Sequence, residues 1–444
     1  MTNPFLFDTL RKSISFNFLS SMKKQNSSYL VKVIITTALA VGVFGLFGIQ
    51  TTFAATAKKV TPPKLEISGW VPYWRSATGT KEALDNLSVF QEINPFGYTV
   101  KTNGTLFDAM KVSEEPWASF VATAKAKKIR VVPTVMWSNG TAIHKILSNT
   151  KTRIALEDEI VATVKKNGFD GIDIDFEGKL AETKPYFSTF LKGLYMRMGN
   201  KWVMCTIEAR TPLDSRYDTI PKGIEYANDF VAINKYCDRV RFMAYDQGAI
   251  DVKLNREANG QPYVPIADTR WVEKTIKEAL KTIPAKKISI GVATYGYEYE
   301  VVPLSEYGYR YKMKWAFNPR YATELASTLG VTPQRNAAGE LSFTYNPNAT
   351  TELIHEQASS TIEAVSPVGN NQLAALGMMS GTIRNPATST QTTIKKETTH
   401  IVWWSDSQAI QDKIDLAKKL GVRGISIFKV DGGADPKLWE ILAQ

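Results

Sequence analysis

Residues 170–177 read Asp-Gly-Ile-Asp-Ile-Asp-Phe-Glu, and this stretch decides how the rest of the chain is interpreted. Side chains of a β-strand alternate between its two faces, so Asp173, Asp175 and Glu177 share one face and the intervening Ile, Ile and Phe share the other. Such acids can also mark a solvated face or a divalent-ion loop. An ion loop would carry Gly and Asn between its acids, whereas apolar residues there indicate a buried strand. The pattern favours a catalytic strand.

Seven further apolar runs of strand length accompany this one. The eight predicted strands are Leu65–Val71, Glu92–Tyr98, Ile129–Met136, Gly171–Phe176, Trp202–Ala209, Val240–Tyr245, Ile288–Thr294 and Gly424–Phe428. Helix-like segments such as Thr152–Lys166 and Val272–Thr282 lie between most of them, with apolar residues at three- and four-residue spacing. This alternation predicts an α/β fold, a (β/α)8 TIM barrel that spans residues 65–444.

The gap between the seventh and eighth predicted strands is far longer than one crossover needs. It contains the strand-like pieces Tyr307–Trp315 and Leu341–Tyr345 and a polar stretch, Thr388–Thr399, predicted to be a loop. We therefore expect a small α+β subdomain to be inserted at residues 297–400.

Burial of three neighbouring carboxylates raises the pKa of at least one of them, which is what a general acid requires. Glu177 ends the strand, at the C-terminal mouth of the barrel where such folds bind substrates. Glu177 is therefore the predicted catalytic acid. Asp170 has the opposite parity and is assigned to the turn or the barrel floor.

The stretch matches every fixed position of D-G-x-D-x-D-x-E, and through it the chain resembles glycoside hydrolase family 18, the chitinase-like enzymes. The resemblance extends from about Leu65 to the C-terminus. It is closest to the bacterial spore-cortex and cell-wall N-acetylglucosaminidases. The stretches that suggest this branch are Gly69-Trp70-Val71-Pro72-Tyr73-Trp74, Val402-Trp403-Trp404 and Gly421-Val422-Arg423-Gly424-Ile425-Ser426.

The resemblance implies retaining, substrate-assisted hydrolysis of β-1,4 bonds in polymers of N-acetylglucosamine, either peptidoglycan and spore cortex or chitin. Glu177 would protonate the leaving oxygen while the sugar's own acetamido oxygen attacks the anomeric carbon. Asp175 would orient the acetamido N–H, and Asp173 would tune Asp175 by sharing its proton. Tyr245 would donate a hydrogen bond to the acetamido carbonyl, unless it is only a packing residue. Asp246 would contact sugar hydroxyls or the same acetamido group.

Further substrate-binding candidates lie at the predicted strand ends. Flat rings stack on the apolar faces of sugars, although a Trp is more often packed than exposed to ligand. Glu208 and Arg210 would form hydrogen bonds with sugar hydroxyls or pair with each other. Met243 is a further candidate, two residues before Tyr245 in the chain. The aromatic candidates are Tyr73, Trp74, Trp137, Trp403 and Trp404.

Two departures from the family pattern concern the substrate subsites. Phe428 stands at the end of the eighth strand, where the family usually has a tryptophan that floors the subsite of the cleaved sugar. A phenyl ring still stacks on a sugar, over a smaller area. The third strand continues as Thr134–Gly140, where many members carry S-x-G-G. Neither change removes the acid.

The N-terminal segment predicts export. Lys23, Lys24 and Lys32 precede an uncharged stretch, Val33–Ala57, that includes small residues typical of a cleavage site. Residues 1–57 are therefore expected to be a signal peptide or, alternatively, a membrane anchor whose tether would be residues 33–53. Residues 58–64 form a linker. Either way we expect a protein that is secreted or held in the cell envelope.

Composition narrows the remaining options. A net charge of +11 suits anionic wall polymers, but there is no Lys/Arg-rich run interleaved with aromatics that would indicate nucleic acid. Cys205 lies in an apolar run, so a buried free thiol is favoured, with a disulfide to Cys237 as the alternative. The three histidines are not spaced for zinc, so neither a metal nor a cofactor is implied. A monomer is expected.

Other functions remain open. A catalytically weak or silent glycan-binding, lectin-like protein on the same barrel is one alternative, although it would be expected to have lost Glu177. A structural or morphogenetic wall protein is another.

Overall fold

The computed structural model describes residues 64–305, 308–347 and 399–443. The predicted signal or anchor segment, the linker before Lys64 and residues 388–398 of the predicted polar loop lie outside these ranges. Within them, no helix is both long and apolar enough to cross a membrane.

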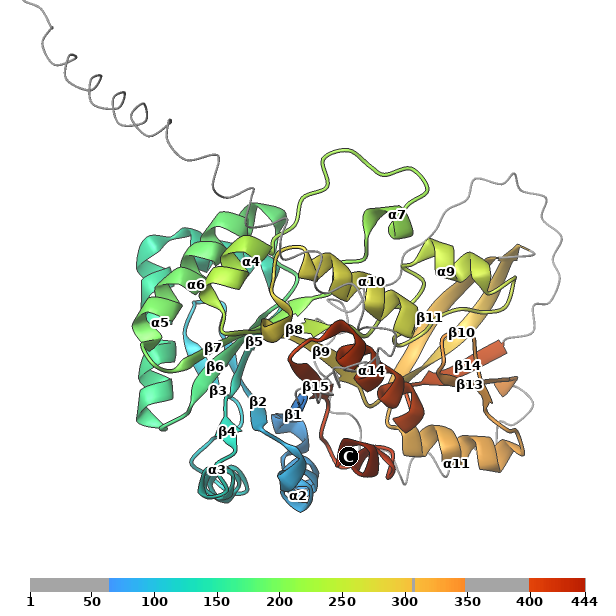
Figure 1. The fold of residues 1–444 in the computed structure, drawn as a ribbon, viewed down its shortest axis with the longest axis horizontal. Helices are drawn as coiled ribbons and strands as arrows, with labels where there is room; N and C mark the ends of the chain where they lie inside the picture. The colour runs from blue at the N-terminus through green and yellow to red at the C-terminus, as the bar shows by residue number, and fades with distance from the viewer. Residues whose placement is uncertain (1–63, 306–307, 348–398, 444) are drawn as a thin grey trace, which may run out of the picture. The chain divides into compact units, whose positions relative to one another are not determined.

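Eight parallel strands close into a barrel (Figure 1). The third barrel strand consists of two short pieces, β4 and β5, that follow each other in the chain. The first strand, β1, pairs with the last, β15, and with the second, β2, which closes the barrel. The strands are β1 (Glu66–Pro72), β2 (Glu92–Val100), β4 (Arg130–Val131) with β5 (Thr134–Trp137), β6 (Gly171–Phe176), β7 (Trp202–Glu208), β8 (Arg239–Met243), β9 (Ile288–Ala293) and β15 (Gly424–Phe428), with β3 (Leu106–Asp108) antiparallel on β2. The predicted (β/α)8 fold is confirmed.

Helices follow most of the strands and bury their apolar sides against the barrel. Several start at an Asp or Asn whose side chain accepts a backbone N–H of the first turn, as Asp268 does for α10 and Asp406 for α14. The helices are α2 (Ser76–Asp85), α3 (Trp117–Ala126), α4 (Gly140–Ser148), α5 (Thr150–Lys166), α6 (Lys184–Met198), α7 (Leu213–Arg216), α8 (Phe230–Tyr236), α9 (Val252–Glu257), α10 (Thr269–Leu280), α14 (Ser407–Leu420) and α15 (Leu438–Leu442), with short 3-10 turns η1 (Tyr73–Arg75), η2 (Leu87–Val89), η3 (Ala181–Thr183) and η4 (Ala285–Lys287).

A second, antiparallel sheet lies between the seventh and eighth barrel strands, as predicted, in the order β11-β10-β14-β13-β12. Glu340 joins it to the barrel, because its buried carboxylate accepts the backbone N–H groups of Ile266 and Ala267 at 2.8 and 2.9 Å and the indole N–H of Trp403 at 2.7 Å. Its elements are β10 (Gly296–Ser305), β11 (Gly308–Phe317), α11 (Pro319–Leu329), β12 (Gln334–Arg335), β13 (Leu341–Tyr345) and β14 (Thr399–Trp404).

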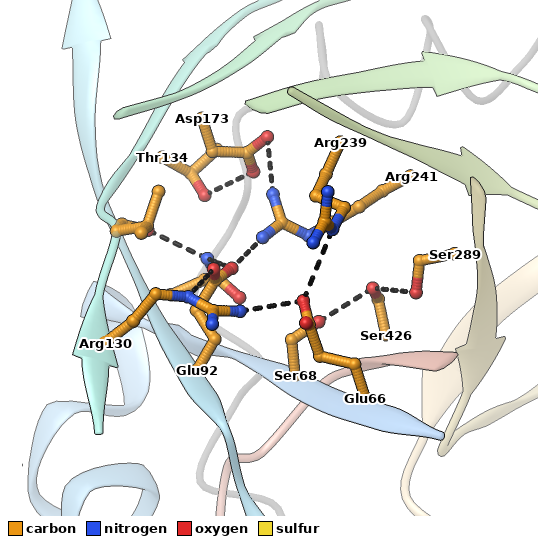
Figure 2. Close-up of polar contacts among 12 residues, drawn as sticks. Glu66, Ser68, Glu92, Arg130, Thr134, Asp173, Arg239, Arg241, Ser289 and Ser426 are labelled. Carbon is orange, nitrogen blue, oxygen red and sulfur yellow. Dashed lines mark hydrogen bonds and ion pairs between the residues drawn. The ribbon is translucent and has the colours of Figure 1, made fainter. Parts of the chain in front are cut away.

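A network of charged side chains fills the barrel interior around Asp173 of β6 (Figure 2). Arg241 is buried on β8 and forms ion pairs with Glu92 and with Asp173, the latter at 2.9 Å. Arg130 continues the network from Glu92 (3.1 Å) to Glu66 (2.7 Å). Buried charges are tolerated only when they are paired, so these alternating charges let the interior hold the carboxylates of β6.

The expectation of a free, buried Cys205 is wrong. Cys205 and Cys237 form a disulfide, with Cα atoms 5.9 Å apart. The Cys205 side chain lies on the outer face of β7, under the helix layer. Cys237 follows the last residue of α8, just before β8, which pairs with β7. The two sulfurs therefore lie close together. The alternative of a disulfide is the correct one.

Replacing both cysteines by alanine should lower the free energy of unfolding by about 2–4 kcal/mol, because the bond closes a loop of 32 residues in the unfolded chain. Guanidinium denaturation with and without a thiol reductant measures the effect. The reductant should destabilise the native chain and leave the double variant unchanged. An equal unfolding midpoint for native and variant proteins would contradict the expectation.

Candidate active site

The register of β5 and β6 sets which side chains enter the barrel. Thr134 pairs with Asp173 and Met136 with Asp175, so these positions face inward. On the outer face Phe176 is fully buried, and its ring stacks at 5.3 Å on Phe190 of α6. Asp170 lies just before the strand, where its carboxylate accepts the N–H of Val131 at 2.8 Å. The alternating pattern thus places the acids inside and the apolar residues under the helices.

Asp173 is the deepest of the three acids and is held by several donors. The indole of Trp70 donates at 3.1 Å and the hydroxyl of Thr206 at 2.9 Å. Figure 2 shows two further partners, the hydroxyl of Thr134, which donates at 2.9 Å, and the ion-paired Arg241. Burial raises the pKa of Asp173 to about 6, against the hydrogen bonds, which lower it. This acid is rigidly fixed.

Asp175 and Glu177 occupy the upper part of the same face. Burial and the neighbouring Glu177 and Asp173 raise the pKa of Asp175 well above its ordinary value. Burial, followed by repulsion from Glu208, raises the pKa of Glu177 to about 7, while Lys179 and a hydrogen bond with Asp175 lower it. Glu177 therefore holds a proton near neutral pH, as a general acid must. Asp175 Oδ1 is buried and accepts no hydrogen bond from the described residues.

Tyr245 and Asp246 follow β8 and face the same space. Gly291 on β9 leaves room for the Tyr245 ring, since a Cβ there would lie 2.9 Å from it. Burial and the nearby Asp175 and Asp246 raise the pKa of Tyr245, so its hydroxyl stays a donor. Asp246 accepts hydrogen bonds of 2.7 Å from both Tyr295 and Tyr297. Burial raises the pKa of Asp246 to about 6, against these hydrogen bonds.

Phe428 lies within an aromatic cluster at the barrel mouth. Its ring stacks on Tyr245 with centroids 5.7 Å apart and meets Trp70 edge-on at 5.9 Å. Trp74 is half-buried, meets Tyr73 at 5.1 Å, and has a buried indole N–H without a partner in the described structure. Tyr73 is 42% exposed and Met243 is half-buried. Phe428, Trp74 and Tyr73 thus belong to one group of touching rings that also includes Phe96, and their contact with a sugar stays a prediction, as does that of Met243.

The structure packs the other three tryptophans away from the mouth, contrary to prediction. Trp137 is 3% exposed and contacts Phe176 at 5.4 Å on the outer face of the barrel, because its position has the opposite parity to Met136. Trp403 lies buried in β14, where its indole binds Glu340. Trp404 is buried on the other face of the same strand, beside Phe343. None of the three offers a ring face to a sugar in this structure.

Glu208 and Arg210 do not pair with each other. Glu208 accepts hydrogen bonds from the N–H of Gly178 at 3.1 Å and from the amide of Asn228 at 2.7 Å. The guanidinium of Arg210 lies 3.7 Å from the Tyr226 ring centroid and donates to the Asn228 carbonyl at 3.0 Å. Arg210 thus serves to hold the loop that carries Asn228.

Three residues of the site were not among the sequence candidates. Tyr295 and Tyr297 hold Asp246 from the start of the inserted sheet, and Lys179 lies two positions after Glu177. All three follow closely after the end of a predicted strand, and this position could have marked them as candidates. No cluster of three or more acids, histidines or cysteines able to hold a metal exists among the described residues.

The model of glycosyl hydrolases family 18 matches residues 50–433, which is most of the sequence. This chain belongs to glycoside hydrolase family 18. The family resemblance is confirmed, and membership implies a glycan that contains N-acetylglucosamine as the substrate.

The curated relatives of this family 18 chain include the following two proteins of Bacillus subtilis (strain 168). The uncharacterized glycosylase YvbX is 22% identical over 334 residues, 72% of this chain and 76% of the relative. A cortical fragment-lytic enzyme is 25% identical over 307 residues, 68% of this chain but only 56% of the relative, so this chain spans little more than half of that protein.

Solved structures share the fold of this family 18 chain. The spore cortex-lytic enzyme SleL of Bacillus megaterium QM B1551 aligns with a TM-score of 0.60 and 22% identity, over 86% of this chain and 74% of that one. A chitinase from Chromobacterium violaceum ATCC 12472 aligns with a TM-score of 0.61 and 17% identity, over 86% and 98%. At these identities the likeness concerns the fold alone.

Proposed function

We propose that this family 18 glycosylase hydrolyses β-1,4 bonds of an N-acetylglucosamine polymer by a substrate-assisted, retaining mechanism with Glu177 as the acid and base. The observation that carries the proposal is the inward row of carboxylates along β6 and at its end, in which burial raises the pKa of Glu177 to about 7 next to the buried Asp175. Two protein carboxylates of different role are the usual glycosidase requirement. Here the sugar's acetamido group replaces the second one.

The first step transfers the Glu177 proton to the glycosidic oxygen. As the bond between that oxygen and the anomeric carbon breaks, the acetamido carbonyl oxygen of the same sugar bonds to the anomeric carbon, which forms a cyclic oxazolinium ion. Asp175 Oδ1, which has no partner among the described residues, accepts the acetamido N–H and balances the positive charge. The hydroxyl of Tyr245 donates to the acetamido oxygen and orients it.

The second step reverses the first. A water molecule attacks the anomeric carbon, the ring of the oxazolinium ion opens, and the Glu177 carboxylate takes the proton from the water. Two displacements at one carbon retain its configuration. Asp173, held by Arg241 and its hydrogen-bond donors, fixes the charge below Asp175 throughout.

Peptidoglycan or spore cortex is the favoured polymer, because the curated relatives include cortical fragment-lytic enzymes, and the basic charge suits an anionic wall. Chitin is the alternative. We also propose that the protein works outside the cytoplasm, in keeping with its disulfide and the apolar N-terminal sequence. Release of reducing ends from purified peptidoglycan, spore cortex and a chitin oligomer by the full chain tests the proposal and ranks the polymers. Binding of all three without release would indicate the lectin-like function instead.

The pH dependence of hydrolysis follows from Glu177. The first step needs the protonated acid, so kcat/KM should fall about tenfold for each pH unit above about 7. Glu208 and Asp246 favour protonation of Glu177 through their negative charges, whereas the positive charge of Lys179 and the hydrogen bond with Asp175 oppose it. Initial rates from pH 4 to pH 9 measure the profile. An alkaline limb near the ordinary pKa of a glutamate would contradict the described environment.

A further inference from the structure

The two peptide groups that flank Glu177 are held by one ion pair. Gly178 has a φ of +60°, which turns the chain back after β6 and brings the Lys179 side chain over the end of its own strand. There the Lys179 ammonium donates to the carbonyl of Phe176. On the other side of the acid the N–H of Gly178 donates to Glu208 at 3.1 Å. The Lys179 ammonium and the Glu208 carboxylate form an ion pair, with Nζ 3.6 Å from Oε2.

The Lys179 side chain is buried, which indicates that its contacts with Glu208 and the Phe176 carbonyl are a defined part of the structure. The Lys179 side chain is only 1% exposed, although an ammonium loses much hydration free energy in such a place unless it is paired. Its compensation comes from Glu208, the Phe176 carbonyl and the Phe187 ring, whose centroid is 4.8 Å away. A lysine without a structural partner would instead extend into solvent.

Glu208 is committed to protein partners. Its two oxygens receive Gly178 and Asn228, the latter at 2.7 Å, and Lys179 lies beside them. Burial alone would raise the pKa of Glu208, but Lys179 and these hydrogen bonds outweigh burial and lower it, so Glu208 stays ionised. Each oxygen of Glu208 thus accepts a hydrogen bond from the protein, so we assign this carboxylate to holding the chain, although its side chain is 40% exposed.

We propose that Lys179 and Glu208 are positioning residues, an ion-paired clamp that fixes the backbone on both sides of Glu177 and places one positive and one negative charge within reach of its carboxyl. This inference rests on the proposed function, in which Glu177 is the acid. It reassigns Glu208 from sugar binding to control of the acid. The charges of the clamp act in opposite directions on Glu177, which gives the clamp a signature that a purely structural pair lacks.

The test compares Glu208→Gln and Lys179→Met in the full chain. Loss of the Glu208 charge should move the alkaline limb of kcat/KM to lower pH by about half a unit or more, and loss of the Lys179 charge should move it to higher pH by a similar amount. The double variant should return close to the native profile. In Glu208→Gln we expect a lower kcat with little change in KM. Shifts in the same direction, no shift, or an effect on KM alone would overturn the clamp.

The control is a surface pair of the same charges. Lys281 and Glu278 form an ion pair of 2.6 Å at the end of α10, with the lysine side chain 70% exposed. Lys281→Met and Glu278→Gln should leave the limb unmoved. Thermal melting checks that every variant folds. If Lys179→Met does not fold, Glu208→Gln decides alone, because glutamine has nearly the same shape and keeps an oxygen for Gly178.

A titration that needs no substrate separates the two proposals. With ¹³C-labelled glutamate carboxyls, the Glu177 signal is assigned by its loss in Glu177→Gln, and its midpoint should move down in Glu208→Gln and up in Lys179→Met. If the native protein cleaves no glycan, the proposed function fails while the titration still tests the clamp. If the native protein cleaves glycan but neither midpoint moves, only the clamp is overturned.

Discussion

Replacing Glu177 by glutamine should lower kcat about a thousandfold and leave KM nearly unchanged. Glutamine has almost the same size as glutamate but cannot give its proton to the leaving oxygen. The residues proposed to surround the sugar, Asp175, Tyr245 and Phe428, are unchanged in this variant, so we expect the glycan still to bind. Initial rates on a soluble chito-oligosaccharide, together with calorimetric binding to the inactive variant, measure both quantities.

The matched control for Glu177→Gln is Glu182→Gln. Glu182 lies in η3, five residues further along, and its side chain is 67% exposed. Its replacement should leave kcat within about twofold of the native value. If the Glu177 variant kept more than a tenth of native activity, another residue would have to supply the proton. The assignment of Glu177 would then be wrong.

Replacing Arg241 by methionine should lower the free energy of unfolding by about 3–5 kcal/mol, because it leaves Asp173 as a buried acid without a cation and removes one of the two arginine partners of Glu92. Arg241 is 2% exposed, so water cannot take its place readily. The loss should shrink as the pH falls, since protonated carboxyls need no cation. Urea denaturation at neutral and acidic pH, followed by fluorescence, measures the change.

Arg256→Met is the control for Arg241→Met. Arg256 pairs with Asp218, but both side chains are more than 60% exposed, so the pair is largely screened by solvent. The urea midpoint of this variant should match that of the native protein. A destabilisation of equal size in the two variants would show that the interior network is no more important than a surface pair.

Strand positions were predictable because barrel strands are bounded apolar runs. The predicted limits of two strands, Gly171–Phe176 and Gly424–Phe428, coincide with β6 and β15. Alternation on β6 also placed Asp173 and Asp175 inside, since parity is a local property of the chain. The same rule applied to β5 would have placed Trp137 outside. The error came from giving residue type more weight than parity.

Contacts between distant segments could not be predicted from local patterns. Arg241 meets Glu92 across the barrel, and Tyr297 reaches Asp246 from the inserted sheet. Nothing in the sequence next to these residues specifies the partner. Trp403 shows the same limit, because its indole donates to Glu340, which lies just before β13 and 63 residues earlier in the chain.

The most direct test of the account is proton NMR of the first product released from an N-acetylated chito-oligosaccharide by the full chain. Substrate-assisted retention predicts that the new reducing end appears first as the β-anomer, and that no product forms with Glu177→Gln or from the de-N-acetylated oligosaccharide. Release of the α-anomer first, or equal cleavage of the de-N-acetylated substrate, would contradict a mechanism in which Glu177 and the sugar's own acetamido group do the chemistry.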